Sequence, residues 1–165
     1  MKQHTVCFSG YRPEKLDIPA EELVPRIEAA VRAAVDEGYT RFISGMARGF
    51  DMLAARAVLE YKRENDGVRL ECALPFETQA SKWRDDDLAE YEEILRGADS
   101  ITVVCASSSP ESYIKRNRYM VEHASRLICY FDGRSGGTAY TYKYARRQGL
   151  DVVNLGCFDE QLSFS

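Results

Sequence analysis

The sequence has little of what metal centres, membrane spans and surfaces that bind the nucleic-acid backbone require. Only two histidines occur in 165 residues, and no apolar run approaches the roughly 18 residues of a membrane span. Positive charge is also scarce, because 26 acidic residues outnumber 22 lysines and arginines and the net charge is −4. We therefore expect no metal, no cofactor and no membrane partner. A surface that neutralises many phosphates of a nucleic acid is disfavoured as well.

The five cysteines do not form a disulfide or zinc pattern. Their number is odd, no C-x-x-C pair occurs, and four of them lie in or beside apolar, strand-like runs. This pattern predicts buried structural thiols in a reducing compartment. The N-terminus, MKQHTVCFSG, reads as a strand that starts almost at once and leaves no room for a signal peptide, so we expect the protein in the cytoplasm.

Short apolar runs rich in β-branched and aromatic residues alternate with longer segments of helical spacing. Strands are predicted at 4–9, 40–44, 68–74, 100–105, 126–131 and 151–155, and helices include 20–37, 50–64 and 138–148. This alternation predicts an α/β fold, a Rossmann-like doubly wound, mostly parallel sheet of about six strands with helices on both faces. The length predicts one domain, 1–165, whose weakly patterned tail, 156–165, is expected to be poorly ordered.

In a parallel sheet the segments that follow the strands converge at one edge, where ligands of open α/β sheets bind. Here they are SGYRP (9–13), SGMARGFD (44–51), PFETQ (75–79), ASSSP (106–110) and DGRSGGTAYT (132–141). A strand order of 3-2-1-4-5-6 would make the loops after strands 2, 1, 4 and 5 neighbours. We therefore predict a ligand basin at this edge.

Two of these segments, SGMARGFD and DGRSGGTAYT, are glycine-rich turns that enter helices. Such turns expose backbone N–H groups to an anion, and the helix N-terminus adds a favourable dipole. Each loop alone is equally consistent with a tight turn closed by a helix cap. Together they predict a phosphate site. Its candidate residues are Ser9, Gly10, Arg12, Gly45, Arg48, Gly49, Asp51, Gly136, Gly137, Thr138 and Thr141.

The helix that follows SSSP is predicted to be capped by Ser108 or Ser109, with Ser108 and Glu111 spaced as a capping box. Asn117 interrupts its apolar stripe. A buried amide requires partners, so Asn117 bonds either neighbouring backbone or a ligand, and its position favours the ligand. The acidic run 85–87 is typical of a first helical turn rather than a metal site. The candidates for contact with a base or ribose are Phe76, Trp83, Tyr113 and Asn117.

Taken in chain order, these stretches resemble the YpsA-like family of the SLOG superfamily of Rossmann-like nucleotide-binding domains. The resemblance spans nearly the whole chain and rests on SGYRPEKL, ISGMARGFD, ALPFETQASKW, YIKRNRYMVEHASRLICYFDGRSGGTAYT and VVNL. It implies a nucleotide ligand, and a homodimer as is common in the superfamily.

Two related families imply different activities. SGMARGFD looks like the S-G-x-A-R-G-x-D loop of DNA-processing protein A, a single-stranded DNA binder. RNRYM and GGTAYT are similar to signatures of the lonely guy phosphoribohydrolases, which cleave the N-glycosidic bond of nucleoside monophosphates. Arg116 and Met120 match, but Thr141 stands where those enzymes have a glutamate, and a threonine cannot stabilise an oxocarbenium-like state. Arg116 is the one catalytic candidate, and neither Asp51 nor Asp132 is placed by the sequence as the missing carboxylate.

The leading hypothesis is a cytoplasmic sensor or regulator that binds a nucleoside phosphate or an ADP-ribose-like ligand. One alternative is a nucleotide N-glycosidase or phosphoribohydrolase. A second is a single-stranded nucleic acid binder, which the pI near 5.3 disfavours. A third is an interaction domain whose glycine loops have lost their ligand.

Overall fold

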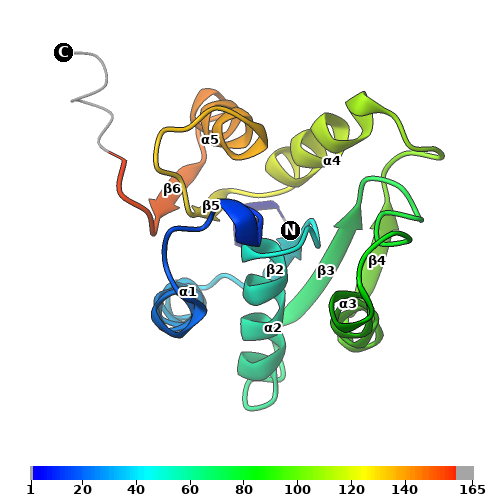
Figure 1. Ribbon diagram of the computed structural model, residues 1–165. Helices are drawn as coiled ribbons and strands as arrows, with labels where there is room; N and C mark the ends of the chain where they lie inside the picture. Colours follow the sequence, from blue (N-terminus) through cyan, green and yellow to red (C-terminus); the bar gives the residue numbers. More distant parts are fainter. Residues whose placement is uncertain (1, 159–165) are drawn as a thin grey trace.

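The computed structural model describes residues 2–158 and contains one six-stranded parallel sheet (Figure 1). The predicted α/β, Rossmann-like fold is confirmed. Each predicted strand is present with slightly shorter bounds. The strands are β1 (Thr5–Ser9), β2 (Arg41–Ser44), β3 (Arg69–Leu74), β4 (Ser100–Val103), β5 (Arg126–Cys129) and β6 (Asp151–Asn154).

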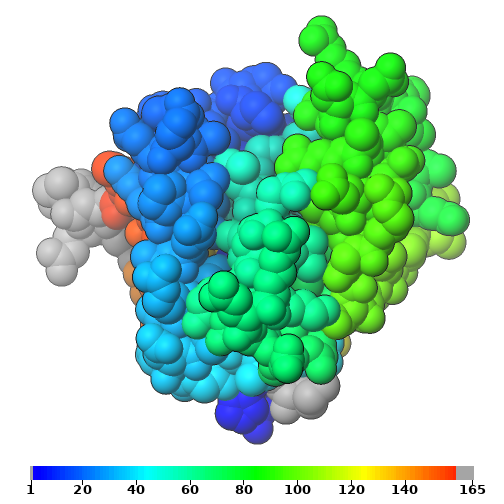
Figure 2. All heavy atoms as spheres, turned by 90° about the horizontal axis from the view of Figure 1, so that it is seen from below, coloured from blue at the N-terminus to red at the C-terminus, as the bar shows by residue number. Residues whose placement is uncertain are grey.

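Within residues 2–158, five α-helices cover the two faces of the sheet. They are α1 (Ala20–Asp36), α2 (Phe50–Lys62), α3 (Asp85–Gly97), α4 (Pro110–Glu122) and α5 (Gly137–Arg147), with two short 3-10 turns, Lys2–His4 and Pro13–Lys15. Helices α1, α2 and α3 lie on one face and α4 and α5 on the other (Figure 1). Figure 2 shows α1, α2 and α3 side by side over the first face. No helix of the described chain, residues 2–158, is long and apolar enough to cross a bilayer.

The centre of the sheet is the core of the molecule. All five residues of β1 are buried, as are all four of β5. The rings of Phe8 and Phe42 stack with centroids 6.0 Å apart, and Phe50 of α2 meets Phe8 edge-on. Because β1 is hydrophobic on both faces, it requires a strand on each side and a helix above and below.

The strand order is β4-β3-β2-β1-β5-β6, so the expected order 3-2-1-4-5-6 is wrong. The fourth strand continues outward beyond β3, because α3 lies on the same face as α1 and α2. Its burial fits an edge: Ile101 and Val103 are about half exposed, at 49% and 45%, whereas β5 beside β1 is fully buried. Asp99 fixes β4 there by accepting the Leu70 N–H of β3 at 2.8 Å.

From β1 to β4 the chain adds each strand on the same side of the sheet, and it then returns to place β5 on the other side of β1. The topological switch point therefore lies between β1 and β5. The segment after β1 turns toward α1 on one face, and the segment after β5 turns into α5 on the other face. The two connections diverge, and a cavity lined by residues of both lies at the carboxyl ends of the strands, the place where open α/β sheets bind ligands.

Several local predictions are refined by the structure. The capping box of α4 joins Ser109 and Ser112, not Ser108 and Glu111, because the Ser112 hydroxyl accepts the Ser109 N–H at 3.1 Å. All five cysteines are free, and burial is complete for three, Cys7, Cys72 and Cys129. Cys105 is partly exposed and Cys157 is exposed, so the prediction of buried thiols is wrong for these two.

The predicted tail, 156–165, lies mostly outside the described residues, which end at 158. At its start the Phe158 ring packs on Phe131, with centroids 4.8 Å apart.

Candidate functional site

The loop after β2, residues 45–49, is closed by two flanking side chains. Ser44 Oγ accepts the Met46 N–H at 3.2 Å and donates to the Asp51 carbonyl at 2.8 Å. The Ala47 N–H donates to Asp51 Oδ2 at 3.4 Å. Met46 has a left-handed φ of 61° and Gly49 one of 89°, and a Cβ on Gly49 would lie 2.5 Å from the Tyr11 carbonyl oxygen. The turn is therefore tight and glycine at 49 is required.

A buried arginine of α4 holds the same loop from the opposite face. Arg116 is 4% exposed, and its Nη1 donates to the Gly45 carbonyl oxygen at 2.5 Å. Its Nε donates to Asn117 Oδ1 at 2.9 Å. A Cβ on Gly45 would lie 2.7 Å from Arg116 Nη1. Gly45 is thus required by the guanidinium group that packs against it, rather than by its backbone angles.

Asp51, in the first turn of α2, is a buried carboxyl that is only partly hydrogen-bonded. It is 5% exposed, and Oδ1 has no hydrogen-bond partner among the described residues. Burial raises the pKa of Asp51 to about 6, while the positive charge of Arg116 and the Ala47 N–H act in the opposite direction. Burial also lowers the pKa of Arg116, again opposed by the Asp51 charge. The two groups therefore favour each other's ionised forms.

The segments after β1 and β5 are joined by a second set of contacts. The Tyr11 hydroxyl donates to Asp132 Oδ1 at 2.7 Å, and Arg134 pairs with Asp132 Oδ2 at 2.7 Å. The Arg134 guanidinium lies over the Tyr11 ring and donates to the Lys15 carbonyl. Hydrogen bonds from Arg134 lower the pKa of Asp132 to about 2. Asp132 is therefore ionised, and its carboxylate oxygens are already bonded to protein groups that join the two segments.

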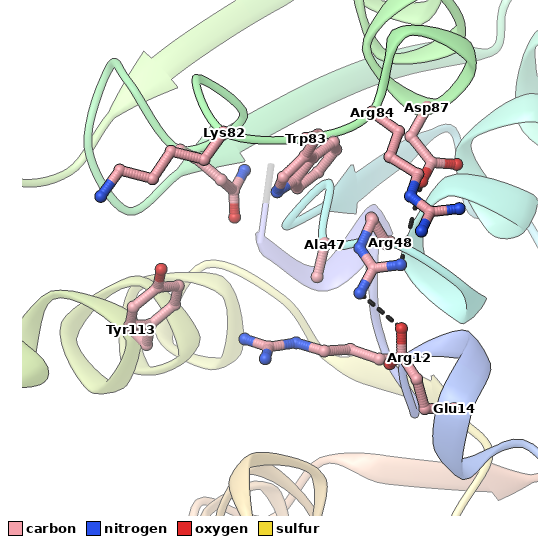
Figure 3. A pocket seen from close by; sticks show the side chains of 10 residues that line it. Arg12, Glu14, Ala47, Arg48, Lys82, Trp83, Arg84, Asp87 and Tyr113 are labelled. Carbon is pink, nitrogen blue, oxygen red and sulfur yellow. Dashed lines mark hydrogen bonds and ion pairs between the residues drawn. The ribbon is translucent and has the colours of Figure 1, made fainter.

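Two adjoining cavities open at this edge of the sheet and share four lining residues, Arg12, Glu14, Ala47 and Tyr113. The smaller, of about 400 Å³, lies at the switch point between the segments after β1 and β5. The larger, of about 630 Å³, extends toward the segment after β3. In Figure 3 Arg12 reaches across the larger cavity toward α4, and Trp83 lies on the opposite wall. Both volumes are in the range of small-molecule sites.

Cations dominate the walls of both cavities although the chain is acidic. Six lysines and arginines line them, against three carboxylates. Arg48 is neutralised by Glu14 at 2.6 Å and by Asp87 at 3.8 Å (Figure 3). Arg12, Lys82 and Arg84 form no ion pair or hydrogen bond through their side chains with any described residue. These three charges are available to an anion.

A comparison with known protein families shows the family to which the chain belongs. The model of the YpsA family, described as the YspA SLOG family, matches residues 6–152. The chain belongs to this family. UPF0398 proteins of Staphylococcus aureus strains JH9 and COL are 23% identical to it over 97% of this chain and 92% of theirs.

Two solved structures share the fold at low sequence identity. DNA processing protein A from Streptococcus pneumoniae has a TM-score of 0.63 and 18% identity, over 96% of this chain and 53% of its own. The protein of the same name from Helicobacter pylori has a TM-score of 0.64 and 16% identity, over 93% of this chain and 65% of its own. This SLOG chain thus spans half to two thirds of those proteins.

Most of the predicted site residues meet in the two cavities. Those that line the smaller one are Ser9, Gly10, Arg12, Asp51, Tyr113, Arg116, Asn117, Gly136, Gly137 and Thr138. Arg12, Arg48, Trp83 and Tyr113 line the larger one.

Four predicted residues line neither cavity: Gly45, Gly49, Phe76 and Thr141. The Thr141 hydroxyl is fully buried and donates to the Gly137 carbonyl at 2.9 Å, so it supports the first turn of α5. Phe76 packs edge-on against Tyr113. The segment ASSSP, 106–110, is also absent from the cavity walls, because it follows the edge strand β4.

Sequence reasoning missed several lining residues. They are Glu14, Lys15, Ala47, Gln79, Lys82, Arg84, Asp87 and Ser135. Lys82 and Arg84 flank Trp83 in SKWRDD, and cations on both sides of an aromatic residue were an available signal. No sequence signal marks Gln79, because the hydrogen bonds from its side-chain amide to the Gly45 and Met46 carbonyls depend on the tertiary fold.

The packing of Arg116 on Gly45 generates a stability prediction. Gly45→Ala should lower the free energy of unfolding by roughly 1–3 kcal/mol, because the added methyl group must displace a buried guanidinium from its carbonyl partner. Urea denaturation measures the change. Gly137→Ala is the matched control, since its Cβ would have no neighbour closer than 3.9 Å and should change stability by less than about 0.5 kcal/mol. Equal effects of the two substitutions would contradict the packing account.

The burial of Asp51 generates a pH prediction. Its pKa is about 6 in the folded chain, against an ordinary 3.8, so between these values the folded state retains a proton that the unfolded chain has released. The free energy of unfolding should therefore fall as the pH rises through this range, by up to roughly 3 kcal/mol from this group. Asp51→Asn should remove that part of the slope in urea unfolding, while Asp86→Asn, an exposed site, should keep it. The same slope in Asp51→Asn as in the parent protein would refute the assignment.

Proposed function

We propose that the protein binds a nucleoside phosphate or a larger nucleotide-derived ligand, such as an ADP-ribose-like molecule, in the two adjoining cavities, and that it acts as a sensor or regulator. One observation carries the proposal. Arg12, Lys82 and Arg84 line the larger cavity and form no ion pair with any described residue, in a chain whose net charge is −4. Unpaired cations in a concave site attract anionic ligands.

The remaining walls suit the other parts of such a ligand. The N-terminus of α5, at Gly136 and Gly137, borders the smaller cavity and offers backbone N–H groups and a positive dipole to a phosphate. Trp83 and Tyr113 are partly exposed aromatic residues of the larger cavity. Each is held edge-on by a second ring, Tyr91 and Phe76 respectively, so both present fixed surfaces to a base.

The proposal predicts ligand-dependent thermal stability. A panel of nucleoside mono- and diphosphates, cyclic nucleotides, NAD and ADP-ribose is tested at increasing concentration. At about a hundred times its dissociation constant a bound compound adds roughly 2.7 kcal/mol to the stability of the folded state. Arg12→Ala should lose most of this gain, because Arg12 lines both cavities. The control Arg32→Ala, an exposed site on α1, should keep it. No shift with any compound, or an equal shift in Arg12→Ala, would contradict the proposal.

A second candidate function is binding of single-stranded nucleic acid. It is favoured by the shared fold with the H. pylori protein, whose structure is described as showing a single-stranded DNA binding mode. Trp83 between Lys82 and Arg84 also offers an aromatic surface with cations on either side.

This candidate predicts that a labelled oligonucleotide changes its fluorescence anisotropy when the protein is added at low salt, and that binding weakens steeply as salt rises. Trp83→Ala should weaken binding by roughly 1–3 kcal/mol if a base stacks on the ring. The control Arg32→Ala should bind as the parent protein does. Absence of an anisotropy change at low salt would exclude this function.

Hydrolysis of an N-glycosidic bond is not proposed, because the hydroxyl of Thr141 is buried and bonded within α5. The homodimer and the cytoplasmic location expected from the resemblance stay predictions.

A further inference from the structure

Asp51 Oδ1 is a buried acceptor with no donor in the described chain. The side chain is 5% exposed and lines the smaller cavity. Oδ2 accepts the Ala47 N–H, but Oδ1 has no hydrogen-bond partner within the described chain. The Gly10 N–H lies near enough to lower the pKa of the carboxyl group, without forming a hydrogen bond to Oδ1. Among the described side chains only one other buried polar atom, Ser125 Oγ, shares this condition, and Ser125 lines neither cavity. An unsatisfied buried carboxylate oxygen requires an explanation.

The neighbouring protein groups do not supply the missing donor. Arg116 directs Nη1 at the carbonyl oxygens of Gly45 and Ala73 and Nε at Asn117 Oδ1. Its charge therefore acts on Asp51 without a hydrogen bond to Oδ1. The Tyr11 hydroxyl, which also lines this cavity, already donates to Asp132. Because no described protein group donates to Oδ1, the cavity is the side from which a ligand can supply the donor.

The residues that line the cavity indicate which kind of ligand could supply that donor. Its walls include Arg12, Arg116 and the N-terminus of α5, which favour an anionic ligand over an ammonium group. A ligand that carries negative charge and also offers a neutral O–H donor within a single cavity of about 400 Å³ matches a sugar phosphate.

We propose that Asp51 Oδ1 accepts a hydrogen bond from a ribose hydroxyl of the bound nucleotide, so that the site selects ribonucleotides over their deoxy analogues. This inference rests on the proposed function and names the part of the ligand that the Asp51 carboxylate recognises. A buried acceptor built for a hydroxyl rejects the analogue that lacks it, because the acceptor is then left unpaired.

The ionised form of Asp51 is the one that accepts this hydrogen bond. The charged groups that act on it are Arg116 from α4 and Arg12 from the segment after β1. Cys7 of β1 also faces it, but burial raises the pKa of that thiol far above neutral, so Cys7 stays uncharged. Since burial raises the pKa of Asp51 to about 6, ribose selectivity should be full above that pH and decline below it.

The test compares adenosine monophosphate with its 2′-deoxy and 3′-deoxy analogues by isothermal titration calorimetry, and repeats the 2′ comparison with the other three bases. One deoxy analogue should bind the parent protein roughly 10- to 100-fold more weakly. The difference should shrink as the pH falls below 6, whereas titration of the phosphate group affects all the compounds alike. Equal affinity of both deoxy analogues and the ribonucleotide would overturn the inference.

Asp51→Asn supplies the matched variant. The amide oxygen can keep the Ala47 N–H, which turns the amide NH₂ to the position of Oδ1 and replaces an acceptor with a donor. Ribose selectivity should be lost in Asp51→Asn and kept in Asp86→Asn, whose charge change lies outside both cavities. Retained selectivity in Asp51→Asn would overturn the assignment.

The outcomes separate the two proposals. If ribo- and deoxynucleotides bind equally, the site binds nucleotides and only the role of Asp51 is refuted. If no nucleotide or nucleotide-derived compound binds at all, the proposed function and this inference both fail. The comparison within the parent protein remains decisive even if Asp51→Asn does not fold.

Discussion

The arrangement of the site depends on the burial of one guanidinium group. Arg116 reaches from α4 to the carboxyl end of β2 and donates to the Gly45 carbonyl, a position that only glycine at 45 leaves open. A buried charge is costly unless it is hydrogen-bonded and compensated. Here carbonyl oxygens, the Asn117 amide and the Asp51 carboxyl share that role. The loop after β2, the start of α2 and the middle of α4 are therefore fixed relative to one another.

The two loop carboxylates, Asp132 and Asp51, differ in their pKa values and in their roles. Asp132 joins the segments after β1 and β5 and is held ionised, with its pKa lowered to about 2 by Arg134. Asp51 is held in the interior beside Arg116, with its pKa raised by burial. One carboxylate is a structural clamp and the other faces the cavity. The same division applies to the arginines, since Arg48 is paired with Glu14 whereas Arg12 is not paired within the described chain.

The fold follows from local patterns that the sequence displays. Periodicity places all six strands and the helices, and the rule that parallel strands end at one edge predicts where the loops meet. The position of β4 does not follow, because its apolar run looks like that of a central strand and only its exposure in the folded chain marks an edge. The sequence does not show on which face of the sheet α3 packs, and that face decides the position of β4.

The site is predictable to the level of loops but not of individual contacts. The glycine turns identify the correct segments, and Asp51, Asn117 and Arg116 do line the smaller cavity. Thr141 and Arg48 show the limit: a threonine in a first helical turn can equally bond the backbone, and Glu14 is distant in sequence from the arginine that it neutralises. Pairing of side chains across loops is a tertiary property, and it decides which charges are left for a ligand.

The most direct test of the central claim is to map the amide resonances of the protein while a stabilising nucleotide is titrated. The account predicts chemical-shift changes at residues 9–15, at Ala47 and at 135–138, which surround the two cavities. Amides at the opposite edge of the sheet, such as those of Gly38, Gly67 and Gly149, should not move. Shifts confined to that opposite edge, with none around the cavities, would show that the cationic basin is not the binding site.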